Sequence, residues 1–146
     1  MGQPQSNLFI PKTQKTDWIA DIADMHRKFG VNPVIRLLDD EKLRTFLKFR
    51  IDFLQEELNE MQTAEVAEDV VDALIDLCVV AIGTLNAFDV DAYEAWNRVH
   101  DKNMQKSRGI NESRPNPLGL PDLIKPEGWT SPTHADNVGL LSRIFN

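Results

Sequence analysis

The chain has 146 residues, 42% of them hydrophobic, and a formal net charge of −7, which together describe one acidic domain large enough to bury a core. The negative charge argues against non-specific binding to nucleic acid. Cys78 is the only cysteine, so no intrachain disulfide can form, and its apolar neighbours indicate core packing rather than a reactive thiol. Neither a signal-like N-terminal segment nor an apolar run of membrane length stands out, so we expect a cytoplasmic protein that does not enter a membrane.

Apolar residues recur at helical spacing in four stretches and predict four helices joined by short breaks. The expected ranges, in chain order, are 17–29, about 40–62, about 63–87 and 92–107. We therefore predict an all-α fold, with a four-helix bundle as the catalytic core over residues 17–107 and an N-terminal arm over residues 1–16. Thr16 is expected to cap the first helix, Gly30 and Asn32-Pro33 to end it, and residues 34–38 to form an apolar turn.

The periodic pattern stops at Arg108, where the chain becomes rich in proline and glycine. This segment is too apolar for a free linker, since it holds several leucines and Trp129. We predict an extended C-terminal tail over residues 108–146 that packs on the bundle or on a neighbouring subunit. Residues 138–145 are expected to form one last short helix.

A strongly acidic stretch spans the second and third predicted helices. Residues 51–97 contain twelve acidic side chains and no Lys or Arg, so they carry about −12, and the rest of the chain carries about +5. On the third helix, Glu65, Asp69, Asp72 and Asp76 fall within roughly 60° of one another, whereas the remaining positions are almost all apolar. An acidic stripe is therefore expected to enter a hydrophobic core.

Carboxylates in a core must be paired, protonated or bound to metal, and oxygen-only clusters of this kind suit Mg²⁺ or Mn²⁺. The alternative is a solvated acidic face, which charge runs usually are. The narrow stripe and the absence of basic partners four residues away favour the metal site. The second helix is basic in its first half and acidic in its second, which reverses the preference of the helix dipole and indicates function.

Two basic features allow two interpretations each. His26 lies among apolar residues, where a histidine is either hydrogen-bonded in the core or a ligand. Arg98, Lys102 and Lys106 recur every four residues on the fourth helix. They form either a solvated face that complements the helix dipole or a phosphate-binding ridge that faces the acidic cluster.

Four sequence segments together point to a known family. In chain order they are Met25-His-Arg-Lys-Phe-Gly30, Glu56-Glu-x-x-Glu60 with the acid-bearing helix after it, Val99-His-Asp-Lys-Asn-Met-Gln-Lys106 and Lys125-Pro-Glu-Gly-Trp129. They resemble the all-α nucleotide pyrophosphohydrolases of the MazG type, in the phosphoribosyl-ATP pyrophosphohydrolase-like branch that includes bacteriophage members. The resemblance covers about residues 17–132. One position departs from the family's Glu-x-x-Asp motif, because Ala73 precedes Asp76 where a glutamate is usual.

The resemblance implies hydrolysis of a nucleoside triphosphate, deoxy or ribo, to the monophosphate and diphosphate, with two or more Mg²⁺ ions and Mn²⁺ as an alternative. Glu57 is expected to be the catalytic carboxylate that orients or deprotonates the attacking water. The expected metal ligands are Glu56, Glu57, Glu60, Asp69, Asp72 and Asp76. The expected substrate-binding residues are His26, Phe29, Lys102, Asn103, Lys106, Lys125 and Trp129.

Three alternatives stay open at this stage. The chain would be a phosphoribosyl-ATP pyrophosphohydrolase of histidine biosynthesis, a non-catalytic acidic helical protein that docks a basic partner, or a simple structural bundle. A homo-dimer or homo-tetramer is expected, both from the resemblance and because so apolar a third helix needs more cover than one short bundle gives. A phage-encoded member would work in the host cytoplasm. The spacing of residues does not disclose which base or sugar is preferred.

Overall fold

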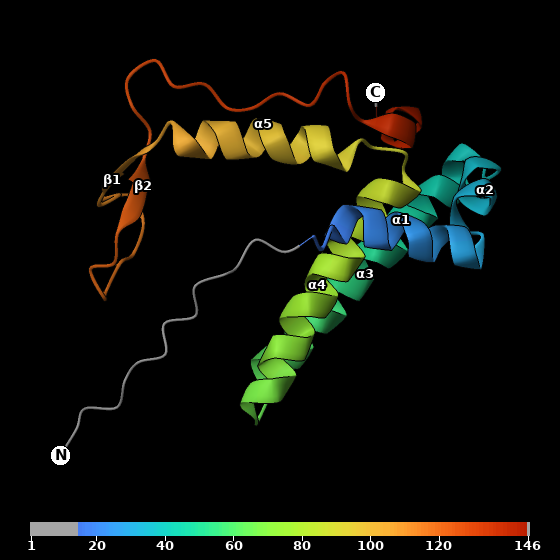
Figure 1. Ribbon diagram of the computed structural model, residues 1–146, viewed down its shortest axis with the longest axis horizontal. Helices are drawn as coiled ribbons and strands as arrows, with labels where there is room; N and C mark the ends of the chain where they lie inside the picture. The colour runs from blue at the N-terminus through green and yellow to red at the C-terminus, as the bar shows by residue number, and fades with distance from the viewer. Residues whose placement is uncertain (1–14, 146) are drawn as a thin grey trace.

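The computed structural model describes residues 15–145, so the predicted N-terminal arm lies almost wholly outside the described residues. The elements in chain order are α1 (Trp18–Phe29), α2 (Val31–Arg36), α3 (Asp40–Thr63), α4 (Ala67–Ala87), α5 (Ala92–Met104), β1 (Ser107–Gly109), β2 (Asp122–Ile124) and the 3-10 helix η1 (Gly139–Arg143). Helices dominate the chain, which confirms the predicted all-α class (Figure 1).

The structure differs from the prediction at the start of α1 and in the segment that follows the helix. Asp17, rather than Thr16, caps the helix, because its carboxylate accepts the Ala20 N–H at 3.0 Å. Gly30 ends the helix in the left-handed region (φ +66°), as predicted. The predicted turn over residues 34–38 is wrong, since α2 follows at once. Pro33 fits the first turn of α2, where its missing N–H costs no helical hydrogen bond.

The helices α3 and α4 form a long hairpin and share the most extensive contacts in the fold (Figure 1). The range of α3 agrees with the prediction to within a residue or two. The helix α4 begins at Ala67, later than predicted, because Ala64 and Val66 are extended. The helix α1 packs across α4, so α1, α3 and α4 make up the helical layer that carries the acidic residues.

The best-buried core lies at one end of this hairpin. Leu43 at the start of α3 and Phe88 just after α4 are fully buried, and α2 adds Ile35. The opposite end of the hairpin is thinly covered, so Val71 and Leu74 on α4 are 62% and 47% exposed. The prediction that the acidic stripe enters a core is therefore wrong for a single chain, because α3 and α1 cover only part of the surface of α4.

By length and composition alone, α4 would suffice to cross a membrane, which corrects the expectation that no apolar run reaches that length. Core helices of soluble proteins meet the same two criteria. The helix packs along α3, which carries charged side chains such as Lys48 and Asp52 on its exposed side. This packing covers only part of the apolar surface of α4, since Val71 and Leu74 stay exposed.

The helix α5 begins at Ala92, as predicted, with Asp91 as its cap. It ends at Met104, earlier than predicted, because the chain then enters a small antiparallel hairpin. In this hairpin Ser107 pairs with Ile124 and Gly109 with Asp122. The sequence did not predict these two short strands. After β2 the tail turns back and runs along α5 (Figure 1).

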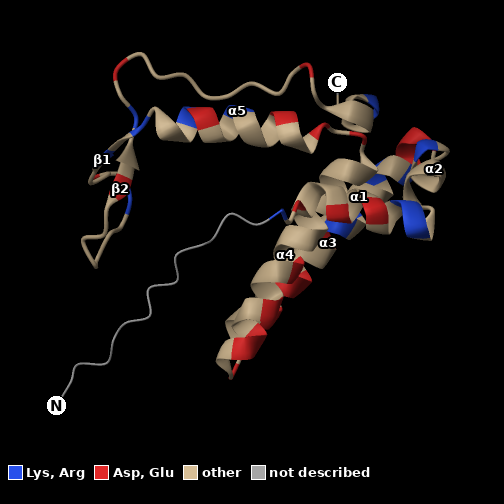
Figure 2. Ribbon diagram, viewed as in Figure 1, with Lys and Arg blue, Asp and Glu red and all other residues tan. Residues whose placement is uncertain are grey.

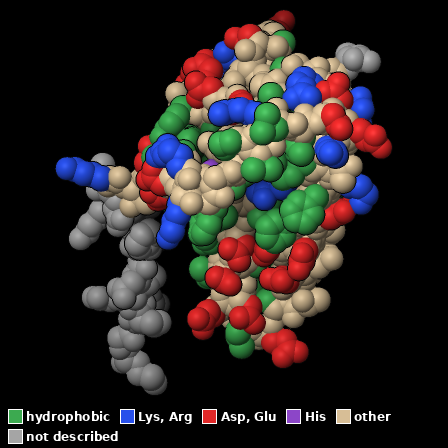
Figure 3. Space-filling model, turned by 90° about the vertical axis from the view of Figure 1, so that its right-hand side faces the viewer, with side chains coloured by type: hydrophobic (Ala, Val, Ile, Leu, Met, Phe, Trp, Pro, Cys, Tyr) green, Lys and Arg blue, Asp and Glu red, His purple; other side chains and the backbone are tan. Residues whose placement is uncertain are grey.

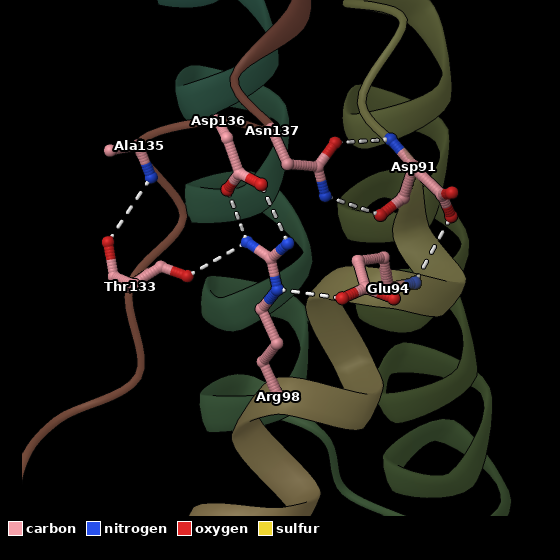
Figure 4. Close-up of polar contacts among 7 residues, drawn as sticks. All are labelled: Asp91, Glu94, Arg98, Thr133, Ala135, Asp136 and Asn137. Atoms are coloured by element: carbon pink, nitrogen blue, oxygen red, sulfur yellow. Dashed lines mark hydrogen bonds and ion pairs between the residues drawn. The ribbon is translucent and has the colours of Figure 1, made fainter.

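The tail is fastened to α5 by a cluster of polar contacts (Figure 4). Arg98 donates to both carboxylate oxygens of Asp136, at 2.6 and 3.0 Å, and to Glu94 at 2.9 Å. Asn137 accepts from the Asp91 N–H at 2.9 Å and donates to the Asp91 carbonyl at 2.8 Å. These contacts fix the tail against the first turns of α5.

The end of the tail closes on the buried core. Gly139 takes φ +52°, and the next residue, Leu140, donates its N–H to the Phe88 carbonyl at 2.7 Å. Arg143 donates to the Asp40 carboxylate at 2.8 and 3.0 Å and to a backbone carbonyl of the α2–α3 connection. The short helix predicted over residues 138–145 is present as η1.

Candidate active site

Glu57 on α3 is buried, with 7% of its surface exposed, and its Oε2 has no hydrogen-bond partner among residues 15–145. Burial raises the pKa of this carboxyl above its usual range, and the negative charge of nearby acids raises the pKa further. The four acids are Glu60, Asp76, Glu56 and Asp72. A buried carboxyl oxygen in such surroundings is stable when it is protonated or when a cation lies beside it.

The acids around Glu57 line the thinly covered end of the α3–α4 hairpin (Figures 2 and 3). Asp76 is half-buried, and the other predicted ligands are exposed: Glu56, Glu60, Asp69 and Asp72. Within residues 15–145, no three His, Cys, Asp or Glu side chains are close enough to hold a metal ion together. Carboxylate oxygens are nevertheless the donors that Mg²⁺ and Mn²⁺ take, and the unpartnered Glu57 oxygen fits such an ion.

A pocket of about 210 Å³ lies between α1, α3 and α4 beside Glu57. Its polar lining comes from His26, Arg50, Glu57 and Asp76, and its apolar lining includes Phe53 and Val80. The pocket thus brings together three of the predicted site residues, one from each helix: His26, Glu57 and Asp76.

His26 is buried, and its Nδ1 lies 2.6 Å from Oδ1 of Asn86 on α4. Because that oxygen is an acceptor, Nδ1 carries the hydrogen, and Nε2 is left as the acceptor of the ring. A Cβ on Gly83 would lie at an ordinary contact distance of 3.4 Å from Nε2 of His26 but only 2.9 Å from Nη2 of Arg50, so this glycine leaves room for the guanidinium. The first interpretation of His26 is confirmed, because the ring is hydrogen-bonded in the core. The ring also lines the pocket, and its role as a ligand stays a prediction.

Arg50 is the pocket residue that the sequence analysis missed. Its Nε donates to Thr84 Oγ1 and its Nη2 to the Val80 carbonyl, both at 2.9 Å. A sequence signal did exist, since Arg50 precedes Glu57 by seven residues, and a seven-residue spacing places two side chains on the same face of a helix. In the sequence alone, Arg50 contributes only to the basic first half of its helix.

The other predicted substrate-binding residues lie away from this pocket. Trp129 donates its Nε1–H to the Lys102 carbonyl at 2.9 Å, and the ammonium groups of Lys106 and Lys125 each lie 5.0 Å from the centre of its ring. Asn103 accepts from Lys106. This α5–tail group is separated from the acidic end of the α3–α4 hairpin within one chain (Figures 1 and 2).

Phe29, at the end of α1, is also outside the pocket. Its ring is 70% exposed, and the Lys28 ammonium lies 5.6 Å from the ring centre. A single chain therefore unites His26 with the acidic residues but leaves Phe29 and the α5–tail group elsewhere.

A helical hairpin with acids on both helices and a buried carboxyl agrees with the fold that the sequence resemblance implies. The family model described as phosphoribosyl-ATP pyrophosphohydrolase matches residues 35–103, from α2 through most of α5. The match covers a little under half of the chain, confirms the predicted resemblance to the MazG-like all-α branch, and supports nucleotide pyrophosphohydrolase activity in general. No curated protein matches the chain. All six predicted metal ligands fall inside the matched segment, whereas His26, Lys125 and Trp129 fall outside it.

Proposed function

We propose that this enzyme hydrolyses a nucleoside triphosphate, deoxy or ribo, between its α and β phosphates, with Mg²⁺ or Mn²⁺ bound at the acidic cluster. The observation that carries the proposal is the buried oxygen of Glu57, which has no hydrogen-bond donor within the part of the chain that the structure describes and lies amid four further acids. The family match supplies the reaction class. The identity of the metal and of the triphosphate is the proposed part.

In this proposal Glu56, Glu60, Asp72 and Asp76 hold the ions, with Asp69 as a further ligand. Bound divalent ions neutralise the phosphate charge and make water more acidic. Glu57 holds the attacking water and accepts its proton, a role that suits a carboxyl whose pKa is raised. The water oxygen bonds to the α-phosphorus as the bond from that phosphorus to the bridging oxygen breaks, so nucleoside monophosphate and diphosphate form.

The test is a diphosphate-release screen over all NTPs and dNTPs with Mg²⁺ and with Mn²⁺. We expect monophosphate and diphosphate in equal amounts from at least one substrate. Release of inorganic phosphate alone, or of nothing from any triphosphate, would contradict the proposal. The latter result is also what a non-catalytic acidic interaction protein predicts.

A second candidate substrate is phosphoribosyl-ATP, which the description of the matching family names. The bond broken in this compound also joins the α and β phosphates, so the residues proposed for nucleoside triphosphate hydrolysis would serve here too. Adding this compound to the screen separates the two candidates, because the physiological substrate should give the higher kcat/KM.

We also propose that the enzyme is a homo-dimer or homo-tetramer. Support comes from the uncovered side of α4, where Val71, Leu74 and Ile75 are 45% to 62% exposed, and from the exposed ring of Trp96 on α5. In such an assembly the α5–tail group of one copy would reach the acidic cluster of another, which one chain alone does not allow. Light scattering of the wild type and of Leu74→Glu tests this, and a wild type with the mass of one chain would contradict it.

A further inference from the structure

The side chain of Arg50 is half-buried, and no acid among residues 15–145 forms an ion pair with it. The ion pairs formed among residues 15–145 involve other basic side chains, such as Arg36 with Asp89 and Arg143 with Asp40. Burial lowers the pKa of the Arg50 guanidinium, as expected for a cation that is partly removed from water. An arginine placed so is common where an anionic ligand completes the site.

The guanidinium is held in one orientation. Its bonds to Thr84 Oγ1 and to the Val80 carbonyl fix it on α4, and the Phe53 ring lies 5.7 Å from its central carbon. Thr84 Oγ1 in turn donates to the Val80 carbonyl at 2.7 Å, so it is itself oriented. These contacts use two of the guanidinium N–H groups and leave the others free to bind an acceptor.

The position of Arg50 relative to the acids follows from helix geometry. Arg50 lies two turns before Glu57 on α3, a rise of about 10 Å, and its contact residue Val80 lies one turn, about 6 Å, after Asp76 on α4. The cation and the acids therefore lie at successive levels of the same pocket. A chain of linked phosphates is the kind of ligand that reaches from divalent ions at the acids to a guanidinium a turn or two away.

The volume of the pocket limits which part of the substrate enters it. At about 210 Å³ it is smaller than the roughly 300–1,000 Å³ of pockets that enclose whole small molecules. That volume suits phosphoryl groups better than a nucleoside. We propose that Arg50 binds the β- and γ-phosphate oxygens of the substrate, and hence the leaving diphosphate, at the end of the pocket away from the acids. This inference rests on the proposed function and assigns the leaving-group end of that site.

The test is calorimetric binding of inorganic diphosphate in the presence of Mg²⁺ to the full chain. We expect Arg50→Met to weaken diphosphate binding by about tenfold to a hundredfold, as loss of charged hydrogen bonds does, with nucleoside monophosphate binding changed less than about twofold. The diphosphate affinity of Arg50→Lys should lie between those of the wild type and Arg50→Met, because lysine keeps the charge but lacks the planar guanidinium with its paired N–H donors. The matched control is Arg44→Met, an exposed arginine on the same helix, which should bind diphosphate as the wild type does.

A purely structural role makes a different prediction. Arg50→Met would then melt at a lower temperature and still bind diphosphate normally, which would overturn the inference. A measurement on the wild type tests the inference even if Arg50→Met does not fold. The Nε–H NMR resonance of Arg50 should shift when Mg²⁺ and diphosphate are added. The corresponding resonance of Arg36 should stay in place, and an unmoved Arg50 resonance would also overturn the inference.

Failure here is distinguishable from failure of the proposed function. If the wild type releases diphosphate from a triphosphate but Arg50→Met keeps the same inhibition constant for diphosphate, only the role of Arg50 is lost. If no triphosphate is hydrolysed, the reaction is lost, and the binding measurement still decides whether Arg50 holds diphosphate.

Discussion

His26 on α1 and Asn86 near the end of α4 are joined by a 2.6 Å hydrogen bond between Nδ1 and Oδ1, although they lie 60 residues apart in the chain. The Asn86 carbonyl also accepts from the Asn32 side chain at 2.9 Å, so α2 is tied to the same point. One asparagine therefore fixes both the position of α1 over α4 and the orientation of the histidine that lines the pocket.

We expect Asn86→Ala to destabilise the fold by about 1–3 kcal/mol, because it leaves the buried His26 Nδ1–H without an acceptor. Urea unfolding measures the change. Asn59→Ala is the control, since the exposed Asn59 side chain bonds only to the Gln55 side chain among residues 15–145. This variant should cost less than about 0.5 kcal/mol. Equal losses in both variants would show that the His26–Asn86 bond contributes nothing specific.

Glu57→Gln should lower turnover by about a hundredfold or more while leaving Mg²⁺ binding largely intact, because it removes the carboxylate assigned to the attacking water. Steady-state kinetics and a Mg²⁺ titration measure the two effects. Normal turnover would remove Glu57 from this role.

The same substitution should change how stability depends on pH in the metal-free protein. The folded pKa of Glu57 is raised above its ordinary value of 4.5, so the folded state keeps a proton over a pH range in which the unfolded chain has lost it. Stability is therefore greatest below that ordinary value and falls as pH rises towards the folded pKa. Glu57→Gln should lack this fall and be the more stable protein at neutral pH without metal. A wild type whose metal-free stability does not fall over this range would contradict the assignment.

Two glycines with positive φ offer a matched test of the tail's contact with the core. A Cβ on Gly139 (φ +52°) would lie 2.0 Å from the Phe88 carbonyl oxygen, whereas one on Gly119 (φ +62°) would meet no atom within 4 Å. Gly119→Ala should cost about 1 kcal/mol of stability from backbone strain alone. Gly139→Ala should cost about 2 kcal/mol or more, because it also displaces η1 and breaks the Leu140–Phe88 bond. Thermal unfolding measures both, and equal costs would show that the tail does not pack on Phe88.

The tail should be released in acid. Hydrogen bonds from Arg98 hold the pKa of Asp136 below its ordinary value of 3.8. This pair therefore stabilises the folded tail above that value, and the contribution is lost as pH falls through the lower, folded pKa. Fluorescence of Trp129 and hydrogen exchange over residues 129–145 should show the loss. Asp136→Asn should remove this acid transition and loosen the tail at neutral pH, whereas Asp101→Asn, at an exposed site on α5, should change neither.

Local patterns predicted the helices well, because apolar residues at helical spacing mark α1, α3, α4 and α5. They did not predict α2, since Asn32-Pro33 is typical of a helix break. Pro33 lies in the first turn of a new helix only because Gly30, in the left-handed conformation, ends α1 just before it. The strands β1 and β2 are three residues each and gain their stability from pairing across a long loop, which leaves no alternation to detect.

The candidate site was predictable in composition but not in arrangement. Angular positions on two helices grouped the acids, yet only the packed structure shows that Glu57 is the buried member. The apolar surface of α4 predicted burial without saying whether this chain or another copy supplies the cover. Arg50 was missed because its role depends on a contact with Val80, 30 residues away.

The most direct measurement of the central claim, that acids on α3 and α4 form a divalent-cation site, is the melting temperature of the wild type in EDTA and with added Mg²⁺ or Mn²⁺. An ion present at a hundred times its Kd stabilises the folded state by about 2.7 kcal/mol. For a chain of this size that corresponds to a rise of about 5–10 °C, which Asp72→Asn with Asp76→Asn should abolish and Glu41→Gln should leave intact. A wild-type melting temperature that is the same in EDTA, Mg²⁺ and Mn²⁺ would contradict the account.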